Sequence, residues 1–125
     1  MATRYYRAKG RTNFEAGRSA ECIVRTQLER EGYHVAEARW KGDYGEIDLI
    51  LADADGFVFV EVKKARSFDE AAHRLGPRQV RRILTSALDY VSQSSLGLNA
   101  TMRFDLAVVN AIGECEIHQN AFGEA

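Results

Sequence analysis

The sequence has few cysteines, no long apolar run and almost no net charge. Its two cysteines, Cys22 and Cys115, are too few for a disulfide framework and lack the C-x-x-C spacing of zinc and redox motifs. No apolar stretch approaches the length that spans a bilayer, and the N-terminal segment has no apolar core of a secretion signal. We therefore expect a cytoplasmic protein in a reducing compartment.

The formal net charge of −1 excludes a general basic footprint for nucleic acid. Any such binding has to come from local clusters of Lys and Arg. Length and composition are typical of one globular domain, which we place at residues 14–125.

Residues 1–13 are predicted to form a flexible basic arm, in which basic residues alternate with Tyr5 and Tyr6. This pattern suits phosphate contact and base stacking, although many such termini are simply solvated. The basic residues of the arm are Arg4, Arg7, Lys9 and Arg11.

Residues 45–63 are predicted to form a β-hairpin around which the rest of the chain is organised. Both halves are rich in Ile, Leu, Val and Phe, and the Asp-Gly pair at 55–56 is a strong turn signal. A turn of two or four residues places Asp48, Glu61 and Lys63 on the same face. The opposite face is apolar and is expected to pack against a core. Its members are Ile47, Leu49, Leu51, Val58, Val60 and Val62.

The charged face of this hairpin is a candidate metal site. Two half-buried carboxylates side by side raise the cost of ionising each other, and a divalent cation relieves that cost. Mg²⁺ prefers oxygen ligands and retains several waters, so Asp48 and Glu61 could share one ion. Lys63 points to the same side and could orient or deprotonate a metal-bound water. The alternative is a cross-strand salt bridge with little effect on stability.

A helix is predicted over residues 14–31, with Asn13 as its N-cap and Gly32 as its stop. Glu21 lies within the apolar stripe of this helix, where a carboxylate is costly. It either pairs with Arg25 on the flank or, if the helix covers the charged face of the hairpin, joins the candidate metal site. The apolar stripe consists of Phe14, Gly17, Val24 and Leu28.

The remaining chain completes an α/β pattern. Strands are predicted over residues 33–40, 102–110 and 115–119, a helix over 77–95, and a mobile loop over 64–76. The order is αβββαββ, which indicates a mixed sheet with helices packed against it rather than a doubly wound parallel fold.

Basic side chains stand in the opening turns of the helix at 77–95. The macrodipole disfavours cations there and favours anions, so we expect these basic side chains to bind phosphates. The alternative is pairing with Asp69 or Glu70. Gln79 lies beside them and could donate to a water in the site or to backbone. The basic residues are Arg78, Arg81 and Arg82.

A set of short motifs extends along nearly the whole chain after residue 13: Gly17-Arg18-x-x-Glu21, Gly32-Tyr33, Gly45-Glu46-Ile47-Asp48-Leu49-Ile50, Phe59-Val60-Glu61-Val62-Lys63, Pro77-Arg78-Gln79, Arg103-Phe104-Asp105 and Asn120-Ala121-Phe122. Together these motifs resemble the YraN-like family of uncharacterised bacterial proteins. That family is similar in fold to the PD-(D/E)xK nucleases, which have a restriction-endonuclease-like sheet, and within them to Holliday junction resolvases. The resemblance implies that Asp48 is the motif's Asp, that Glu61 and Lys63 are its Glu-x-Lys, that Glu21 is the helical acidic residue, and that the Val62 carbonyl is a metal ligand.

These observations lead to a functional hypothesis with one alternative. The chain is expected to be an endonuclease that requires Mg²⁺ or Mn²⁺ and hydrolyses branched or flapped DNA, with a homodimer conceivable for a symmetric junction. The alternative is a nucleic-acid-binding module that keeps the nuclease fold without hydrolysis. The expected contacts to nucleic acid are Arg7, Lys9, Arg11, Arg18, Lys64, Arg78, Gln79, Arg81 and Arg82.

Overall fold

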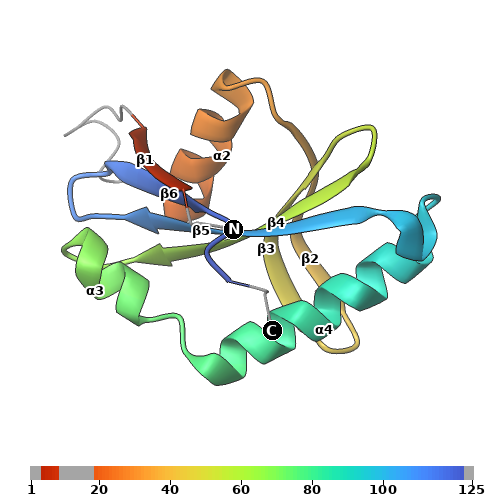
Figure 1. The fold of residues 1–125 in the computed structure, drawn as a ribbon. Helices are drawn as coiled ribbons and strands as arrows, with labels where there is room; N and C mark the ends of the chain where they lie inside the picture. Colours follow the sequence, from red (N-terminus) through yellow and green to blue (C-terminus); the bar gives the residue numbers. More distant parts are fainter. Residues whose placement is uncertain (1–3, 9–18, 123–125) are drawn as a thin grey trace.

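A six-stranded mixed β-sheet runs through the centre of the computed structural model, which describes residues 4–8 and 19–122 (Figure 1). The strand order across the sheet is β1-β6-β5-β4-β3-β2. All neighbours are antiparallel except β4 and β5, which are parallel. A parallel pair needs a long crossover, and α3 and α4 supply it. The strands are β1 (Arg4–Ala8), β2 (His34–Gly42), β3 (Gly45–Ala52), β4 (Gly56–Lys64), β5 (Thr101–Val109) and β6 (Cys115–Gln119). The helices are α2 (Ala20–Arg30), α3 (Phe68–His73), α4 (Pro77–Gln93) and the 3-10 turn η1 (Gly97–Asn99).

The helices lie on both faces of the sheet. Figure 1 shows α2 on one face and α3 and α4 on the other. The cluster under α2 joins Ile23, Val24 and Leu28 to apolar side chains of the sheet. A second cluster packs α4 against the opposite face, and a smaller one lies under α3. The predicted α/β fold with a mixed sheet is therefore confirmed, with β1 and α3 as elements that the predicted order lacks.

The hairpin of β3 and β4 has the register of a four-residue turn. Leu49 pairs with Val60 and Ala52 with Phe57. The Asp53 side chain accepts hydrogen bonds from the backbone N–H groups of Asp55 and Gly56, at 2.8 and 2.9 Å, and so fixes the turn. Continued by one residue beyond the Leu49–Val60 pair, this register places Asp48 opposite Glu61.

The two faces of the hairpin differ from the prediction at one position. Ile47 packs in the cluster under α4, whereas Leu49, two residues further along β3, packs under α2. Arg39 of β2 has a φ of 53° and lies between the pairs Ala38–Leu49 and Trp40–Ile47. A residue in this left-handed region interrupts the alternation of side chains along a strand. Trp40 and Ile47 therefore turn toward α4, and the prediction that Ile47 shares a face with Leu49 is wrong.

The first described helix begins later than predicted. The Ser19 Oγ accepts a hydrogen bond from the backbone N–H of Cys22 at 3.2 Å, so Ser19 is the N-cap and α2 starts at Ala20. The predicted start at Phe14 is wrong for this helix, and its predicted cap Asn13 lies outside the described residues. At the other end, Gly32 has a φ of 93° and confirms the predicted stop.

The segment at 64–76 contains a helix where a loop is predicted. Ser67 caps α3 by accepting from the backbone N–H of Glu70 at 3.1 Å. Ala71 is fully buried, and Phe68 packs against the cluster formed with β5. Helix α4 begins at Pro77 as predicted and ends at Gln93. None of the helices in the described part of the chain is long and apolar enough to cross a bilayer.

Candidate active site

Asp48 and Glu61 meet at the end of the hairpin that lies away from its turn. Glu61 is 5% exposed, and its carboxyl group is in hydrogen-bonding contact with that of Asp48. The Asp48 Oδ2 also accepts a hydrogen bond from the backbone N–H of Val62 at 2.8 Å. Two acidic side chains from adjacent strands therefore converge, as the sequence predicts.

The pKa of Glu61 is raised to about 8 by its surroundings. Burial is the largest cause, followed by the hydrogen bond and the charge of Asp48, while Lys63 acts in the opposite direction. At neutral pH the Glu61 carboxyl group therefore keeps its proton when no cation is bound, because burial beside a second carboxyl group disfavours its charged form.

Two further side chains hold the Glu61 carboxyl group in place. The Lys63 Nζ lies 3.3 Å from the Glu61 Oε2, and Gln79 of α4 donates a hydrogen bond from its Nε2 to the same oxygen. The sequence predicts that Gln79 donates to water or to backbone, so its bond to Glu61 is an addition from the structure. The start of α4 thus helps to orient the candidate acidic ligand.

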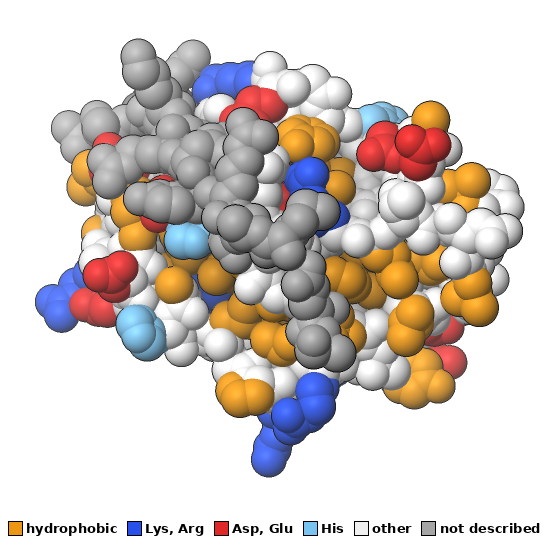
Figure 2. Space-filling view, in the orientation of Figure 1, with side chains coloured by type: hydrophobic (Ala, Val, Ile, Leu, Met, Phe, Trp, Pro, Cys, Tyr) orange, Lys and Arg blue, Asp and Glu red, His pale blue; other side chains and the backbone are white. Residues whose placement is uncertain are grey.

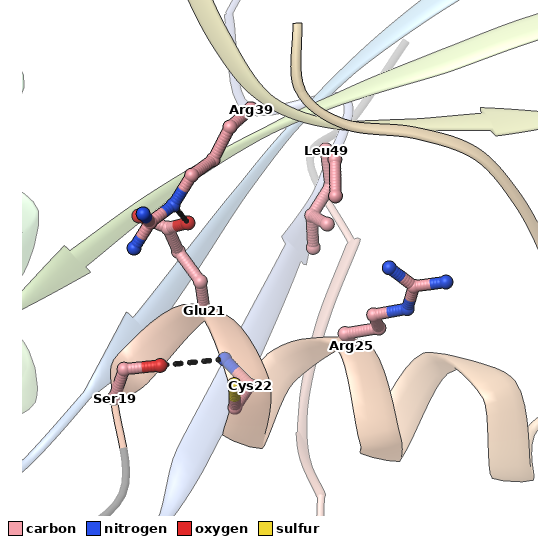
Figure 3. A pocket seen from close by; sticks show the side chains of 7 residues that line it. Ser19, Glu21, Cys22, Arg25, Arg39 and Leu49 are labelled. Carbon is pink, nitrogen blue, oxygen red and sulfur yellow. Dashed lines mark hydrogen bonds and ion pairs between the residues drawn. The ribbon is translucent and has the colours of Figure 1, made fainter.

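Glu21 has a different environment. It extends from α2, which covers the face opposite α4, and its Oε2 lies 2.7 Å from the Arg39 Nε. Figure 3 shows the two side chains paired. They line a pocket of about 320 Å³ together with Ser19, Cys22 and Leu49. The partner of Glu21 is thus Arg39, not the predicted flank residue Arg25, which pairs with Glu29.

The donor set at the hairpin suits a hard cation with few protein ligands. Mg²⁺ commonly binds through one or two carboxylates and keeps several waters, which matches Asp48 and Glu61. Within residues 4–8 and 19–122, no three or more His, Cys, Asp or Glu side chains are grouped to hold a metal. The residues present thus fit a partly hydrated Mg²⁺ or Mn²⁺, and the roles predicted for Glu21 and the Val62 carbonyl remain predictions.

An exposed basic surface begins next to this site, in the first turns of α4. Arg78, Arg81 and Arg82 form no ion pair within the described ranges, so their predicted pairing with Asp69 or Glu70 does not occur. Glu70 instead approaches Arg66 at 3.9 Å. The first turn of α4 has no acidic residue, and its N-cap Gly76 makes no side-chain hydrogen bond. Figure 2 shows Lys and Arg side chains projecting below the sheet on the α4 side. The exposed basic side chains at the start of α4 are Arg78, Arg81 and Arg82.

The hairpin approaches α4 closely at Gly45. Its φ is 137°, and a Cβ added there would lie 2.9 Å from the Cδ of Arg82. The stem of Arg82 therefore lies over the glycine that opens β3, and a larger residue would displace it. This contact joins the basic surface to the strand that carries Asp48.

The other predicted nucleic-acid contacts are only partly described. Lys64 is exposed at the end of β4. Lys9, Arg11 and Arg18 lie outside the described residues. Arg7 is within β1, which pairs antiparallel with β6, so Arg4–Ala8 of the predicted flexible arm form an edge strand.

Two features of the structure have no role predicted from the sequence. One is Arg39, whose left-handed backbone no sequence signal predicts. The other is a network around Asp105, which is 1% exposed and accepts two hydrogen bonds from Arg103, at 2.8 and 2.9 Å. Arg103 also donates to the Tyr33 hydroxyl at 3.3 Å, which ties β5 to the segment that follows α2. Only the family-like motif at 103–105 points to this network.

Fold and site together define an α/β protein whose central hairpin ends in a cluster of Asp48, Glu61 and Lys63. The sequence profile of the uncharacterised protein family UPF0102 matches residues 20–109. The chain is similar to UPF0102 proteins of Ruegeria pomeroyi (45% identical, covering 93% of this chain and 94% of the relative) and Roseobacter denitrificans (46%, covering 92% and 89%). A UPF0102 protein of Cereibacter sphaeroides is 42% identical over 90% of this chain and 97% of its own length. The chain belongs to the UPF0102 family, as the resemblance to YraN-like proteins implies.

Proposed function

We propose that this protein is a metal-dependent endonuclease that hydrolyses phosphodiester bonds of DNA. The observation that carries the proposal is the contact between Asp48 and Glu61, with Lys63 at 3.3 Å from the Glu61 carboxyl group. Two converging carboxyl groups are costly unless they serve a cation, and a buried carboxyl group with a raised pKa, such as that of Glu61, is typical of functional sites. A salt bridge alone needs one carboxylate, not two.

Each side chain of the cluster has a distinct role in this proposal. Asp48 and Glu61 would hold Mg²⁺ or Mn²⁺, which supplies charge stabilisation for the phosphate and lowers the pKa of a bound water. The Val62 N–H fixes Asp48 and the Gln79 amide fixes Glu61, so both acidic groups are preorganised. Lys63, only partly exposed, would orient the attacking water through its Nζ.

The exposed arginines at the start of α4 support a nucleic acid as the substrate. Arg78, Arg81 and Arg82 form no ion pair within the described residues and lie on the helix that provides Gln79. Phosphate groups would compensate their charges at the positive end of the α4 dipole. The preference for branched or flapped DNA rests on the resemblance to junction resolvases, and cutting a symmetric junction would require two copies of the chain.

A cleavage assay tests the proposal. Labelled junction, flap and linear duplex DNA are incubated with the protein in EDTA, in Mg²⁺ and in Mn²⁺, together with Asp48→Asn and Lys63→Ala. Products are expected only with a divalent cation, and each substitution should lower the rate at least about 100-fold because it removes a ligand or the group that positions water. Glu70→Gln, which removes an exposed carboxylate on α3, is the matched control and should cleave normally. Folding of every variant is checked by circular dichroism.

The alternative is a nucleic-acid-binding module without hydrolysis. The Glu61 carboxyl group already has Gln79 and Lys63 as partners, which is compatible with a purely structural cluster. This alternative predicts DNA binding that weakens with salt, no cleavage products with any cation, and equal binding by the wild type and Lys63→Ala. That combination of results would refute the enzyme proposal.

A further inference from the structure

A second pocket lies at the far end of α4, away from the Asp48–Glu61 cluster. It has a volume of about 250 Å³ and is lined by residues of β2 and of the last turns of α4. Gln79 and Tyr90 are eleven residues apart on α4, which corresponds to roughly 17 Å along the helix axis. The pocket is therefore a separate feature of the molecule. Its lining residues are Glu37, Trp40, Tyr90, Gln93 and Ser94.

Aromatic rings form a rigid wall of this pocket. The rings of Trp40 and Tyr90 are 5.2 Å apart and nearly perpendicular, at 86°. The Phe57 ring also packs against the Tyr90 ring, with 5.2 Å between the ring centroids. A Cβ added at Gly42 would clash with the Trp40 Cη2, so the indole covers this glycine. The left-handed backbone of Arg39 turns Trp40 toward α4 and so builds this wall.

Two carboxylates, those of Glu37 and Asp89, lie beside the aromatic wall. Glu37 is half-buried, and the Tyr90 hydroxyl donates to its Oε2 at 3.4 Å. Burial and the charge of Glu37 raise the pKa of Tyr90, so the phenol stays protonated as a donor. In the described part of the chain no Lys, Arg or His lies within ion-pair distance of Glu37. Asp89 adds a second carboxylate near Gly42 and accepts from the Gln93 amide at 2.8 Å.

We propose that this pocket binds a guanidinium group. A planar cation can stack on the indole or phenol ring while its N–H groups donate to the Glu37 carboxylate. The volume is below that of usual pockets for small organic ligands and suits one side chain or a small guanidino compound. Phosphate and carboxylate ligands are disfavoured because Glu37 and Asp89 would repel them. The proposal is independent of DNA cleavage.

The tryptophan provides a direct reporter, because Trp40 is the only one in the chain. Its fluorescence is followed while methylguanidinium chloride is added at constant ionic strength, with sodium chloride as the blank. A saturable change is expected with methylguanidinium. Glu37→Gln keeps the shape of the pocket and should weaken binding about tenfold, the value of one charge-assisted hydrogen bond. Glu70→Gln removes a distant charge and should bind like the wild type.

Two further titrations identify the group and its source. Methylammonium should bind at least about fivefold more weakly than methylguanidinium, because it is not planar and cannot donate a paired hydrogen bond. The peptide acetyl-Gly-Arg-Gly-amide tests a protein source: binding tighter than that of methylguanidinium supports an arginine side chain of a partner, and equal binding supports a free guanidino compound.

The proposal is overturned by three results. One is the absence of a saturable fluorescence change with both methylguanidinium and the peptide. Another is equal weakening by Glu37→Gln and Glu70→Gln, which would indicate a general charge effect. The third is equal affinity for methylammonium and methylguanidinium. Circular dichroism of each variant shows that the fold is retained before it is titrated.

Discussion

Replacing Glu61 by glutamine should change how the stability of the protein depends on pH. The pKa of Glu61 is raised from 4.5 to about 8, mainly by burial and by the contact with Asp48. A raised pKa means that the folded state binds the proton more tightly than the unfolded state. The resulting stability is fully present below pH 4.5 and is lost as the pH rises through about 8. A glutamine side chain cannot ionise, so the stability of the Glu61→Gln variant does not fall in this way as the pH rises.

The magnitude follows from the size of the shift. The pKa moves from 4.5 to about 8, and at 1.36 kcal/mol per unit this gives an upper limit of about 5 kcal/mol. The contact with Asp48 contributes to this shift and the charge of Lys63 opposes it, so the measured effect of Glu61 alone will be smaller. We expect Glu61→Gln to be more stable than the wild type by about 2 kcal/mol at pH 8, with the difference disappearing at pH 4.5.

Urea denaturation at several values of pH between 4.5 and 8.5, without divalent cations, measures this effect. The free energy of unfolding of the wild type should fall relative to that of Glu61→Gln as the pH rises. Glu70→Gln, which removes an exposed carboxylate, should follow the wild type. Parallel curves for the wild type and Glu61→Gln would refute the reasoning, because they would mean that Glu61 titrates normally and that the carboxyl pair does not exist.

Three other predictions test the surrounding structure by urea denaturation. Ser86 is fully buried in α4, and its Oγ has no hydrogen-bond partner within the described residues, so Ser86→Ala should stabilise the fold by about 1 kcal/mol; a loss of stability would show that the hydroxyl is satisfied. Arg39→Gly should be about 1 kcal/mol more stable than Arg39→Ala, because both lose the same ion pair but only glycine relieves the φ of 53°; equal stabilities would contradict the left-handed backbone. Asp105→Asn should cost about 2 to 3 kcal/mol by leaving Arg103 without its buried partner, whereas Glu29→Gln at an exposed pair should cost under about 0.5 kcal/mol; similar costs would argue against the network.

The hairpin and its charged end could be predicted from the sequence because their determinants are local. Alternation of side chains, an Asp-Gly turn signal and the spacing of Glu61 and Lys63 within one strand fix which side chains share a face. Gly45–Ala52 and Gly56–Lys64 are strands almost as predicted, and Asp48 meets Glu61. The helix after Pro77 is equally readable from its proline and its apolar stripe.

The parts that could not be predicted depend on tertiary contacts. Arg39 adopts a conformation that its residue type disfavours, so nothing local indicates that Trp40 and Ile47 turn toward α4. The six residues of α3 are too few to show a helical period and are stabilised by packing against β5. The partner of Glu21 depends on the face that α2 covers, and that face is set by the apolar side chains of the whole sheet.

Divalent-cation binding at the hairpin tests the central claim most directly. Binding of Mn²⁺ at pH 8 can be measured by electron paramagnetic resonance for the wild type, Asp48→Asn and Glu70→Gln. We predict one site per chain in the wild type and in Glu70→Gln, and at least about tenfold weaker binding in Asp48→Asn, which loses one of two carboxylate ligands. Equal Mn²⁺ binding by the wild type and a folded Asp48→Asn, or no binding by any of them, would contradict the account.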